Sequence, residues 1–283
     1  MKPGSPVLIG IIGHPISHSL SPAMHRAAYL ALSLNYLYLP FDIPVPRLPQ
    51  AVQAFRLLRF RGFNVTVPFK ERIVPLLDEL SPEARTTGAV NTVRIDNGRL
   101  TGFNTDGYGF SRSLRTQWRF PVRQRRAVIL GAGGAARGAA CQLAMEKIGA
   151  IGISNRTRSH SVKLKGLIRR EFPGIEVTVL APRSPELKDY LKATDLLVNT
   201  TPLGLRSRDP SPVPAQFLHP RLRVFDLIYN PPVTPLIRAA AKAGSPWMNG
   251  AHMLLYQGAR AFEIWTGKKA PLAEMAGALS LSL

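Results

Sequence analysis

Residues 127–138 read Ala-Val-Ile-Leu-Gly-Ala-Gly-Gly-Ala-Ala-Arg-Gly. The apolar run predicts a buried strand over residues 127–131, and the residues after the glycines predict a helix to about Ile148. Small residues at positions 131, 133 and 136 let the backbone turn tightly and approach a pyrophosphate, which the amides at a helix N-terminus bind. The spacing therefore predicts a dinucleotide site made by Gly131, Ala132, Gly133, Gly134 and Ala135.

The next expected strand, Ala150–Ser154, is followed by Asn155, Arg156, Thr157 and Arg158. Chains that bind NAD place an acidic residue about 20 positions after the glycine loop, where it bonds the ribose hydroxyl. This segment has no acid, and its two guanidinium groups match a phosphate dianion with paired donors. We therefore predict NADP as the cofactor, with these four residues as further contacts.

Strand and helix signals alternate along the rest of the chain. Further strands are expected at residues 7–13, 36–43, 62–67, 177–180, 196–200 and 224–229, and a hairpin at 89–95 and 99–103 around Asn97-Gly98. Further helices are expected at residues 21–32, 48–58, 68–77, 105–118, 234–243 and 253–265. The alternation predicts an α/β fold with parallel sheets, and the basic, proline-containing segment 118–126 marks a domain boundary.

The composition limits the class of protein. A length of 283 residues gives two domains at about 150 residues each. No span approaches the ~20 apolar residues of a transmembrane helix, and the apolar run 7–12 is too short for a signal peptide. The single cysteine, Cys141, excludes an intramolecular disulfide framework. We expect a soluble, cytoplasmic protein without a bound metal.

The net charge is unusual. Thirty-seven Lys and Arg against 17 Asp and Glu give +20, and residues 107–249 hold 23 of these bases and 8 of the acids. Such a field favours anions, which include a phosphorylated cofactor, an acidic metabolite or nucleic acid. No nucleic-acid-binding motif is present, so nucleic acid is not expected as a partner.

Three segments of the first hundred or so residues place polar groups at the expected ends of strands, where open α/β sheets bind ligands. They are Gly13 to Pro22, Asn64 to Lys70 and Gly102 to Gly107. Taken singly, their side chains also have structural interpretations. Ser21 and Asp106 are typical helix caps, and Lys70 is a typical solvated charge at a helix start.

These three segments, the glycine loop and residues 88–92, 155–157, 199–204, 226–234 and 250–257 together resemble the shikimate dehydrogenase family, in the family's order. The resemblance implies two α/β domains with the substrate between them. Residues 1–105 and 250–283 would form the substrate domain, to which the C-terminal helices return, and residues 106–249 a Rossmann-like, doubly wound NADP domain. The implied reaction is the reversible reduction of 3-dehydroshikimate to shikimate with NADPH, in chorismate and aromatic amino-acid biosynthesis.

The resemblance also implies roles for single residues. Lys70 and Asp106 match the catalytic pair, and a lysine ammonium can protonate the alkoxide that ketone reduction creates. Which of the two transfers the proton stays open. The other implied substrate contacts are Ser19 and Ser21 for the carboxylate, Thr66, Asn91 and Gln257 for the ring hydroxyls, and Tyr229 near the carboxylate. Thr200, Leu227 and Gly250 match the cofactor side.

The chain departs from the family pattern at three positions. Arg26 stands where an asparagine is usual, Leu205 where a methionine is common, and His252 where a glycine is usual. A quinate/shikimate or aminoshikimate dehydrogenase is therefore an alternative. A non-catalytic binding or regulatory relative is a weaker one, because such a relative is expected to lose Lys70 or Asp106. The expected partner is a small molecule, shikimate or 3-dehydroshikimate, and a homodimer is kept as an option.

Overall fold

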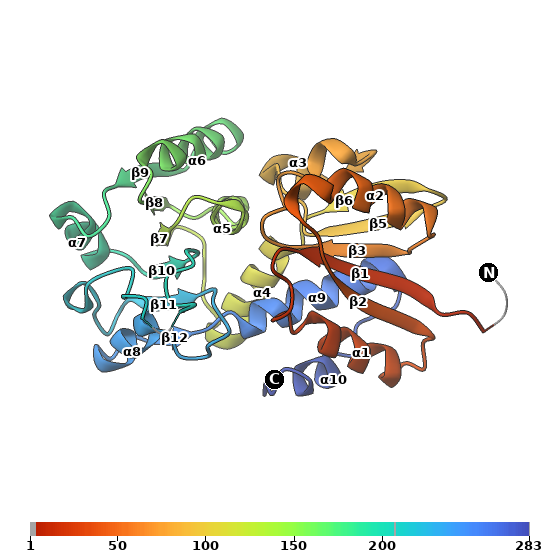
Figure 1. Ribbon diagram of the computed structural model, residues 1–283. Coiled ribbons are helices and arrows are strands. Elements are labelled where there is room, and N and C mark those ends of the chain that lie inside the picture. The colour runs from red at the N-terminus through yellow and green to blue at the C-terminus, as the bar shows by residue number, and fades with distance from the viewer. Residues whose placement is uncertain (1–3, 207, 283) are drawn as a thin grey trace. The chain divides into compact units, whose positions relative to one another are not determined.

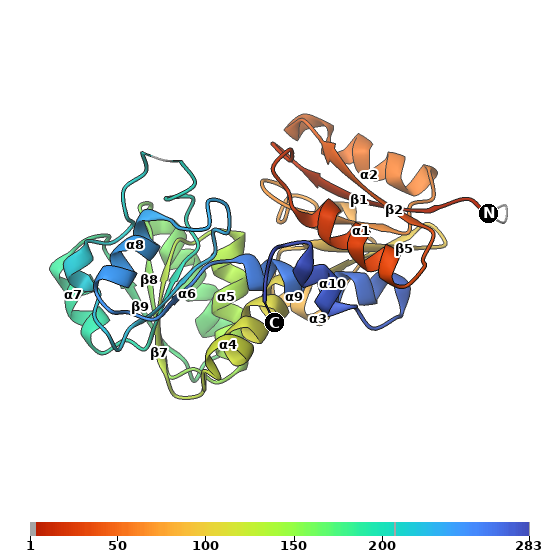
Figure 2. The same ribbon diagram turned by 90° about the horizontal axis from the view of Figure 1, so that it is seen from below.

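The structure is a computed structural model that describes residues 4–206 and 208–282. The chain forms two compact units, the first ending at Gly109 and resuming at Leu254, the second running from Phe110 to Met253. Each unit contains a six-stranded sheet with helices on both of its faces (Figures 1 and 2). The expected two-domain α/β fold is confirmed, and the two borders between the units lie four residues after the expected ones.

The sheet of the first unit is mixed. Its strand order is β2-β1-β3-β5-β6-β4, in which β1 runs parallel to β2 and β3 while β5 is antiparallel to β3 and β6. The hairpin turn uses Asn97 and Gly98, both with positive φ, as a tight two-residue hairpin requires. The strands are β1 (Val7–Gly13), β2 (Tyr36–Asp42), β3 (Gly62–Val65), β4 (Glu79–Leu80), β5 (Thr92–Asp96) and β6 (Arg99–Phe103).

The two faces of this sheet bury different helices, because successive strand side chains point in opposite directions. Ile9 and Ile11 of β1 pack with the first set of helices, and Ile12 of β1 packs with the second. The first set is α1 (Ser21–Ala31), α9 (Ala251–Thr266) and α10 (Leu272–Gly277), and the second is α2 (Leu48–Leu57) and α3 (Pro82–Thr87). Trp265 Nε1 of α9 donates to the Val93 carbonyl at 2.9 Å, which fixes the C-terminal helices on the first sheet.

The second unit has an all-parallel sheet in the order β12-β11-β10-β7-β8-β9. Its strands are β7 (Arg126–Leu130), β8 (Ala150–Ser154), β9 (Glu176–Leu180), β10 (Leu196–Asn199), β11 (Arg223–Asp226) and β12 (Trp247–Met248). The strand order reverses between β7 and β10, the position at which doubly wound sheets bind ligands. One face carries α4 (Asp106–Trp118), α5 (Gly134–Met145) and α6 (Arg158–Glu171), and the other carries α7 (Pro185–Lys192) and α8 (Pro235–Lys242).

One expected element is wrong. Residues 68–77 were expected to be helical, but they form turns and one 3₁₀ turn, η2 (Val74–Leu76). Pro75, which would lie in the interior of such a helix, has no N–H group for the helical ladder, and the chain bends instead, with Phe69 N bonded to the Thr66 carbonyl at 2.9 Å. The sequence analysis missed α3, α6, α7, α10, β4, β12 and two further 3₁₀ turns, η1 (Val45–Arg47) and η3 (Ala215–Phe217).

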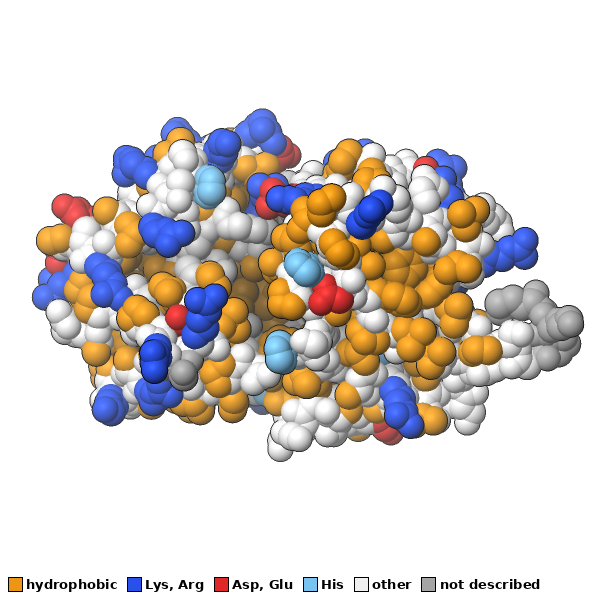
Figure 3. All heavy atoms as spheres, in the orientation of Figure 1, with side chains coloured by type: hydrophobic (Ala, Val, Ile, Leu, Met, Phe, Trp, Pro, Cys, Tyr) orange, Lys and Arg blue, Asp and Glu red, His pale blue; other side chains and the backbone are white. Residues whose placement is uncertain are grey.

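Two surface properties bear on possible partners. No helix within residues 4–206 and 208–282 combines the length and the apolar character needed to span a bilayer. On the side shown in Figure 3, the Lys and Arg side chains of the second unit stand apart from one another instead of forming a continuous stripe. This distribution is typical of a solvated basic surface.

Candidate active site

A buried ion pair lies at one end of the first sheet. Lys70 follows β3, and its Nζ lies 2.6 Å from Oδ2 of Asp106, the first residue of α4. The Lys70 side chain is 19% exposed and that of Asp106 is 7% exposed. The carboxylate is therefore held inside the protein, where the attraction between the charges is stronger than in water, while the ammonium keeps access to solvent.

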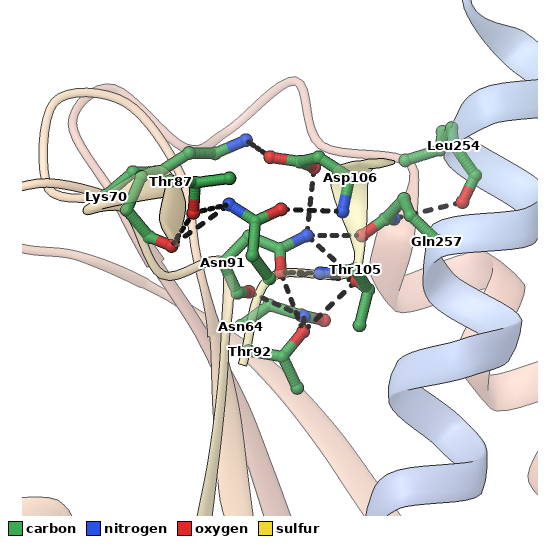
Figure 4. Close-up of polar contacts among 11 residues, drawn as sticks. Asn64, Lys70, Thr87, Asn91, Thr92, Thr105, Asp106, Leu254 and Gln257 are labelled. Carbon is green, nitrogen blue, oxygen red and sulfur yellow. Dashed lines mark hydrogen bonds and ion pairs between the residues drawn. The ribbon is translucent and has the colours of Figure 1, made fainter. Parts of the chain in front are cut away.

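Asn91 connects this pair to the C-terminal helix α9. Its Nδ2 donates to Asp106 Oδ1 and Thr105 Oγ1, each at 2.9 Å, and to Gln257 Oε1 at 3.2 Å (Figure 4). Its Oδ1 accepts from the Thr105 backbone amide at 2.8 Å. The structure thus brings together four of the residues predicted for the substrate site, Lys70, Asn91, Asp106 and Gln257.

The backbone around the pair is fixed by bonds to one short segment, residues 88–91. The Lys70 carbonyl accepts from Val90 N at 2.8 Å. On the other side, Asn104 Nδ2 donates to the Ala89 carbonyl at 3.0 Å, and Asn104 Oδ1 accepts from Asp106 N at 3.1 Å. Asn104 therefore caps the start of α4, and the carboxylate of Asp106 is left for Lys70 and Asn91. The capping role suggested for Asp106 is wrong.

A second layer of polar groups lies behind Asn91. Asn64 Nδ2 of β3 donates to the Asn91 carbonyl at 2.9 Å and to Thr92 Oγ1 at 3.0 Å. Its Oδ1 accepts from Tyr38 Oη of β2 at 2.7 Å. Five residues of this network were not predicted as site residues: Tyr38, Asn64, Thr92, Asn104 and Thr105. All but Tyr38 lie within the family-type segments, and the signal for Asn64 and Asn104 was an amide side chain at a buried strand end.

Ser19 and Ser21 lie at the N-terminus of α1. The residue that caps this helix is Leu20, whose side chain makes no capping bond, while Ser21 is the first helical residue and is buried. Ser21 N donates to Ser19 Oγ at 3.3 Å. The capping role suggested for Ser21 is therefore wrong. No hydrogen bond within the described part of the chain joins either serine to Lys70 or its partners.

Thr66 lies on the loop between β3 and Lys70. A Cβ atom at Gly13 would lie 2.5 Å from Thr66 Cγ2, so the end of β1 and this loop are in close contact. His14 N also donates to the Val67 carbonyl at 3.0 Å. The loops after β1 and β3, which carry the serines, Thr66 and Lys70, therefore form one edge of the first unit.

The glycine loop follows β7 in the second unit. Gly131 has a φ of +110°, and a Cβ there would lie 2.4 Å from Thr200 Oγ1, so only glycine fits. Gly133 caps α5, and a Cβ there would meet no atom within 4 Å. The backbone at the start of α5 is thus open to close approach, which is the arrangement that a pyrophosphate requires.

Arg156 and Arg158 follow the neighbouring strand, β8, and both are exposed. Asn155 Nδ2 donates to the Thr157 carbonyl at 2.9 Å, which closes the turn that leads into α6. Because β7 and β8 are neighbours in the sheet, the two guanidinium groups follow the strand next to the one that leads into the glycine loop. The ribose phosphate of a dinucleotide should lie at this place. The residues present therefore fit NADP.

The remaining predicted contacts, Thr200, Leu227, Tyr229 and Gly250, also belong to the second unit. Thr200 Oγ1 donates to the Leu130 carbonyl at 2.7 Å, next to the glycine loop. A Cβ at Gly250 would lie 2.0 Å from the Leu227 carbonyl oxygen, so packing alone requires glycine at this position. The cofactor roles of Thr200, Leu227 and Gly250 and the substrate role of Tyr229 stay predictions.

Two other titratable side chains are buried away from these groups. Burial raises the pKa of the Cys141 thiol to about 12, so it carries no thiolate at neutral pH. Burial lowers the pKa of His25 to about 3, and the ring is stacked on Tyr38 with centroids 4.5 Å apart. No group of three or more His, Cys, Asp or Glu in residues 4–206 and 208–282 is arranged to hold a metal ion.

A lysine–aspartate pair in one α/β unit and a dinucleotide-type glycine loop in the other define a class, the two-domain nicotinamide-dependent dehydrogenases. A family model described as the shikimate dehydrogenase substrate binding domain matches residues 11–93, and one described as the shikimate 5′-dehydrogenase C-terminal domain matches residues 250–279. The NADP(+) shikimate dehydrogenase of Methanopyrus kandleri is 46% identical over 270 residues, which are 95% of this chain and 93% of that protein. The chain belongs to the shikimate dehydrogenase family.

Two solved structures show the breadth of the family. A shikimate dehydrogenase in complex with NADP+ superimposes with a TM-score of 0.90 at 37% identity, covering 97% of this chain and 95% of that one. The quinate dehydrogenase of Corynebacterium glutamicum, in complex with NAD, superimposes with a TM-score of 0.89 at 31% identity, covering 98% of this chain and all of that one.

Proposed function

We propose that this protein catalyses the reversible, NADP-dependent reduction of 3-dehydroshikimate to shikimate. The observation that carries the proposal is the Lys70–Asp106 pair, held at 2.6 Å and bonded through Asn91 to Gln257. Relatives that are 41–46% identical are named NADP(+) shikimate dehydrogenases, and the residues after β8 fit NADP. The protein is therefore an oxidoreductase that acts on a secondary alcohol.

NADPH, held by the glycine loop and residues 155–158, would supply the hydride that reduces the carbonyl carbon of the substrate. The Lys70 ammonium then gives a proton to the oxygen, on which negative charge develops, and its own charge stabilises that oxygen before transfer. Asp106 holds Nζ in place and is itself oriented by Asn91. We assign the proton transfer to Lys70, because the Asp106 carboxylate already accepts two hydrogen bonds and Lys70 is the more exposed partner, able to regain its proton from water.

We further propose that the edge formed by the loops after β1 and β3 binds the rest of the substrate. Ser19 and Ser21 would bind the carboxylate, with help from the N-terminus of α1, which favours an anion. Thr66, Asn91 and Gln257 would bond the ring hydroxyls, since these short polar side chains have fixed positions. Tyr229 of the second unit would contact the carboxylate.

The NADP site would consist of the glycine loop, residues 155–158 and the cofactor-side residues Thr200, Leu227 and Gly250. Quinate oxidation with NAD is the second candidate, because a relative with that specificity shares the fold over the full chain. Two arginines and no acid after β8 favour NADP over NAD.

Steady-state kinetics with shikimate and NADP, followed by the absorbance of NADPH, tests the proposal. Parallel reactions combine shikimate or quinate with NADP or NAD. We expect the highest kcat/KM for shikimate with NADP. Faster turnover of quinate with NAD would establish the second candidate, and no turnover by the folded protein with any of the four pairs would refute both.

The assembly and location of the protein stay predictions. We propose a cytoplasmic enzyme, and a homodimer is testable by size-exclusion chromatography with light scattering. We propose no nucleic-acid partner, because the sequence contains no nucleic-acid-binding motif. Salt-sensitive binding of duplex DNA tighter than about micromolar near physiological salt would contradict this proposal.

A further inference from the structure

A buried carboxylate fastens three segments of the second unit. Asp226 is the last residue of β11 and has no exposed surface. Its Oδ1 accepts from Asn199 Nδ2 at 2.9 Å and from Ile228 N at 3.1 Å, and its Oδ2 accepts from Thr234 Oγ1 at 2.6 Å. One side chain thus joins the end of β10, the loop after β11 and the start of α8.

Asn199, the last residue of β10, extends this frame. Its Oδ1 accepts from Thr201 N at 3.0 Å and from Thr201 Oγ1 at 2.7 Å, and its Nδ2 also donates to the Leu203 carbonyl at 3.3 Å. Asn199 is fully buried as well. The loop that begins with Thr200 is therefore held by the same pair of side chains that holds the loop beginning with Leu227.

The position of these loops in the sheet indicates what they bind. A doubly wound sheet has two halves that each bind one mononucleotide, on either side of the point where the strand order reverses. The glycine loop follows β7 on one half, so the adenosine end lies there. The loops after β10 and β11 belong to the other half, which leaves them the nicotinamide end. Ile228 also accepts from Gly250 N at 3.1 Å, which ties the fourth cofactor-side segment to the frame.

Stability alone gives little reason for a carboxylate at this position. All three partners of Asp226 are neutral groups, and burial raises the pKa of the carboxyl group to about 6. A buried charge without a cationic partner costs free energy, which only its hydrogen bonds offset. The hydrogen bonds of Asp226 fix the loops after β10 and β11 in place. If those loops bind a ligand, the need for fixed loops explains why a buried carboxylate is present.

We propose that Asp226 is a positioning residue that holds the loops after β10 and β11 in the conformation that binds the nicotinamide end of NADP. The inference rests on the proposed NADP-dependent function. Asp226 itself does not touch the cofactor, and it acts through Asn199, Ile228 and Thr234. The Asp226→Ala variant is therefore expected to impair the nicotinamide end of the site and to spare the adenosine end.

The test compares two ligands by isothermal titration, NADP and adenosine 2′,5′-bisphosphate, which lacks the nicotinamide half. In Asp226→Ala we expect the Kd of NADP to rise about tenfold and that of the bisphosphate to stay within about twofold, as loss of hydrogen bonds at one end predicts. Asp226→Asn should stay within about threefold of wild type for both ligands, because an amide can accept from Asn199 and Ile228 and donate to Thr234.

Asp195 provides the matched control. It precedes β10 at the opposite end of the same sheet, where Oδ2 accepts from Arg126 N at 2.9 Å and Oδ1 from Arg125 Nη1 at 3.2 Å. Asp195→Ala should lower the unfolding temperature and leave both Kd values unchanged. If Asp226→Ala does not fold, Thr234→Val removes the bond to Asp226 Oδ2, together with the capping bond that Thr234 Oγ1 accepts from Ile237 N at 3.2 Å. This variant should weaken NADP selectively, by a smaller factor.

Equal weakening of both ligands in Asp226→Ala would assign the residue to general folding and overturn the inference, as would no change in either. An Asp226→Asn variant as impaired as Asp226→Ala would overturn it too, because charge and not hydrogen-bond geometry would then matter. A wild-type protein that binds neither ligand would refute the NADP proposal itself, and the inference with it.

Discussion

At the residue scale, the ion pair between Lys70 and Asp106 makes the most direct prediction. Lys70→Ala should lower kcat by about 10²-fold or more and change the KM for shikimate little, because the proton donor acts mainly in the transition state. Steady-state kinetics measures both constants. Lys192→Ala is a matched control, since Lys192 also pairs with an aspartate, Asp189, at 2.7 Å, but on the exposed surface of the second unit.

The pair should also act as a unit. Asp106→Ala is expected to cost a similar factor in kcat, and the double variant little more than either single one, because each residue is useful only with the other in place. Near-normal kcat in Lys70→Ala would remove Lys70 from the mechanism. Fully additive losses in the double variant would show two independent roles instead.

The cofactor prediction also concerns a single side chain. Arg156→Ala should raise the KM for NADP by about tenfold or more and the KM for NAD by much less, because only NADP carries the ribose phosphate that the guanidinium binds. Arg169→Ala, which removes an exposed arginine from the last turn of α6, the helix that follows Arg156, should change neither KM. Equal effects of Arg156→Ala on both cofactors would show that Arg156 does not bind the phosphate.

Local sequence motifs predicted the residues of the candidate active site. They did not predict the residues whose hydrogen bonds keep those side chains in place. Lys70, Asn91, Asp106 and Gln257 were found because family-type segments surround each of them. Tyr38 was missed because its bond to Asn64 joins strands that are separated by β1 in the sheet, a contact that depends on tertiary packing. The frame around Asp226 was missed for the same reason, since it needs three segments to meet.

At the scale of elements, the apolar period predicted the helix that begins near residue 251, and the family resemblance implied its return to the first unit. Its direct packing on β3 was not predictable. A Cβ at Gly62 of β3 would lie 2.3 Å from Trp265 Nε1 and 2.3 Å from the Val93 carbonyl oxygen. Gly62 therefore permits α9 to lie directly on β3. The role of this glycine follows from the packing of two elements that are far apart in the sequence, β3 (Gly62–Val65) and α9 (Ala251–Thr266).

Gly62→Ala should destabilise the fold by at least about 1–3 kcal/mol, the usual cost of an overpacked core, because Trp265 or β3 must shift. Gly166→Ala is the control. Gly166 lies within α6 with open space around it, so the alanine should stabilise the helix by about 0.5–1 kcal/mol. Urea unfolding of the three proteins measures both effects. A Gly62→Ala protein as stable as wild type would contradict the close packing of α9 on β3.

At the scale of the whole molecule, the two units contain buried groups that respond to acid in opposite ways. His25 in the first unit has its pKa lowered by burial from 6.5 to about 3, so the stability it contributes is full above pH 6.5 and is lost as the pH falls towards 3. Asp226 in the second unit has its pKa raised by burial from 3.8 to about 6. Its stabilising contribution is present below pH 3.8 and is lost as the pH rises through 6.

The two groups should therefore drive the stabilities of their units apart between pH 6 and pH 4. At 1.36 kcal/mol per unit of pKa, the loss from the first unit through His25 reaches about 5 kcal/mol only below pH 3, and the gain in the second unit through Asp226 reaches about 3 kcal/mol only below pH 3.8. Part of each change falls between pH 6 and pH 4. Other carboxylates titrate in the same range, so the measurement is the difference between wild type and variant in calorimetric scans at each pH. Relative to wild type, His25→Leu should gain stability in the first unit as the pH falls, and Asp226→Asn should lose stability in the second. If the stability difference between wild type and His25→Leu does not vary with pH, the imidazole has the same pKa in the folded and unfolded protein. Water would then reach the ring despite its contacts with Tyr38 and Trp265.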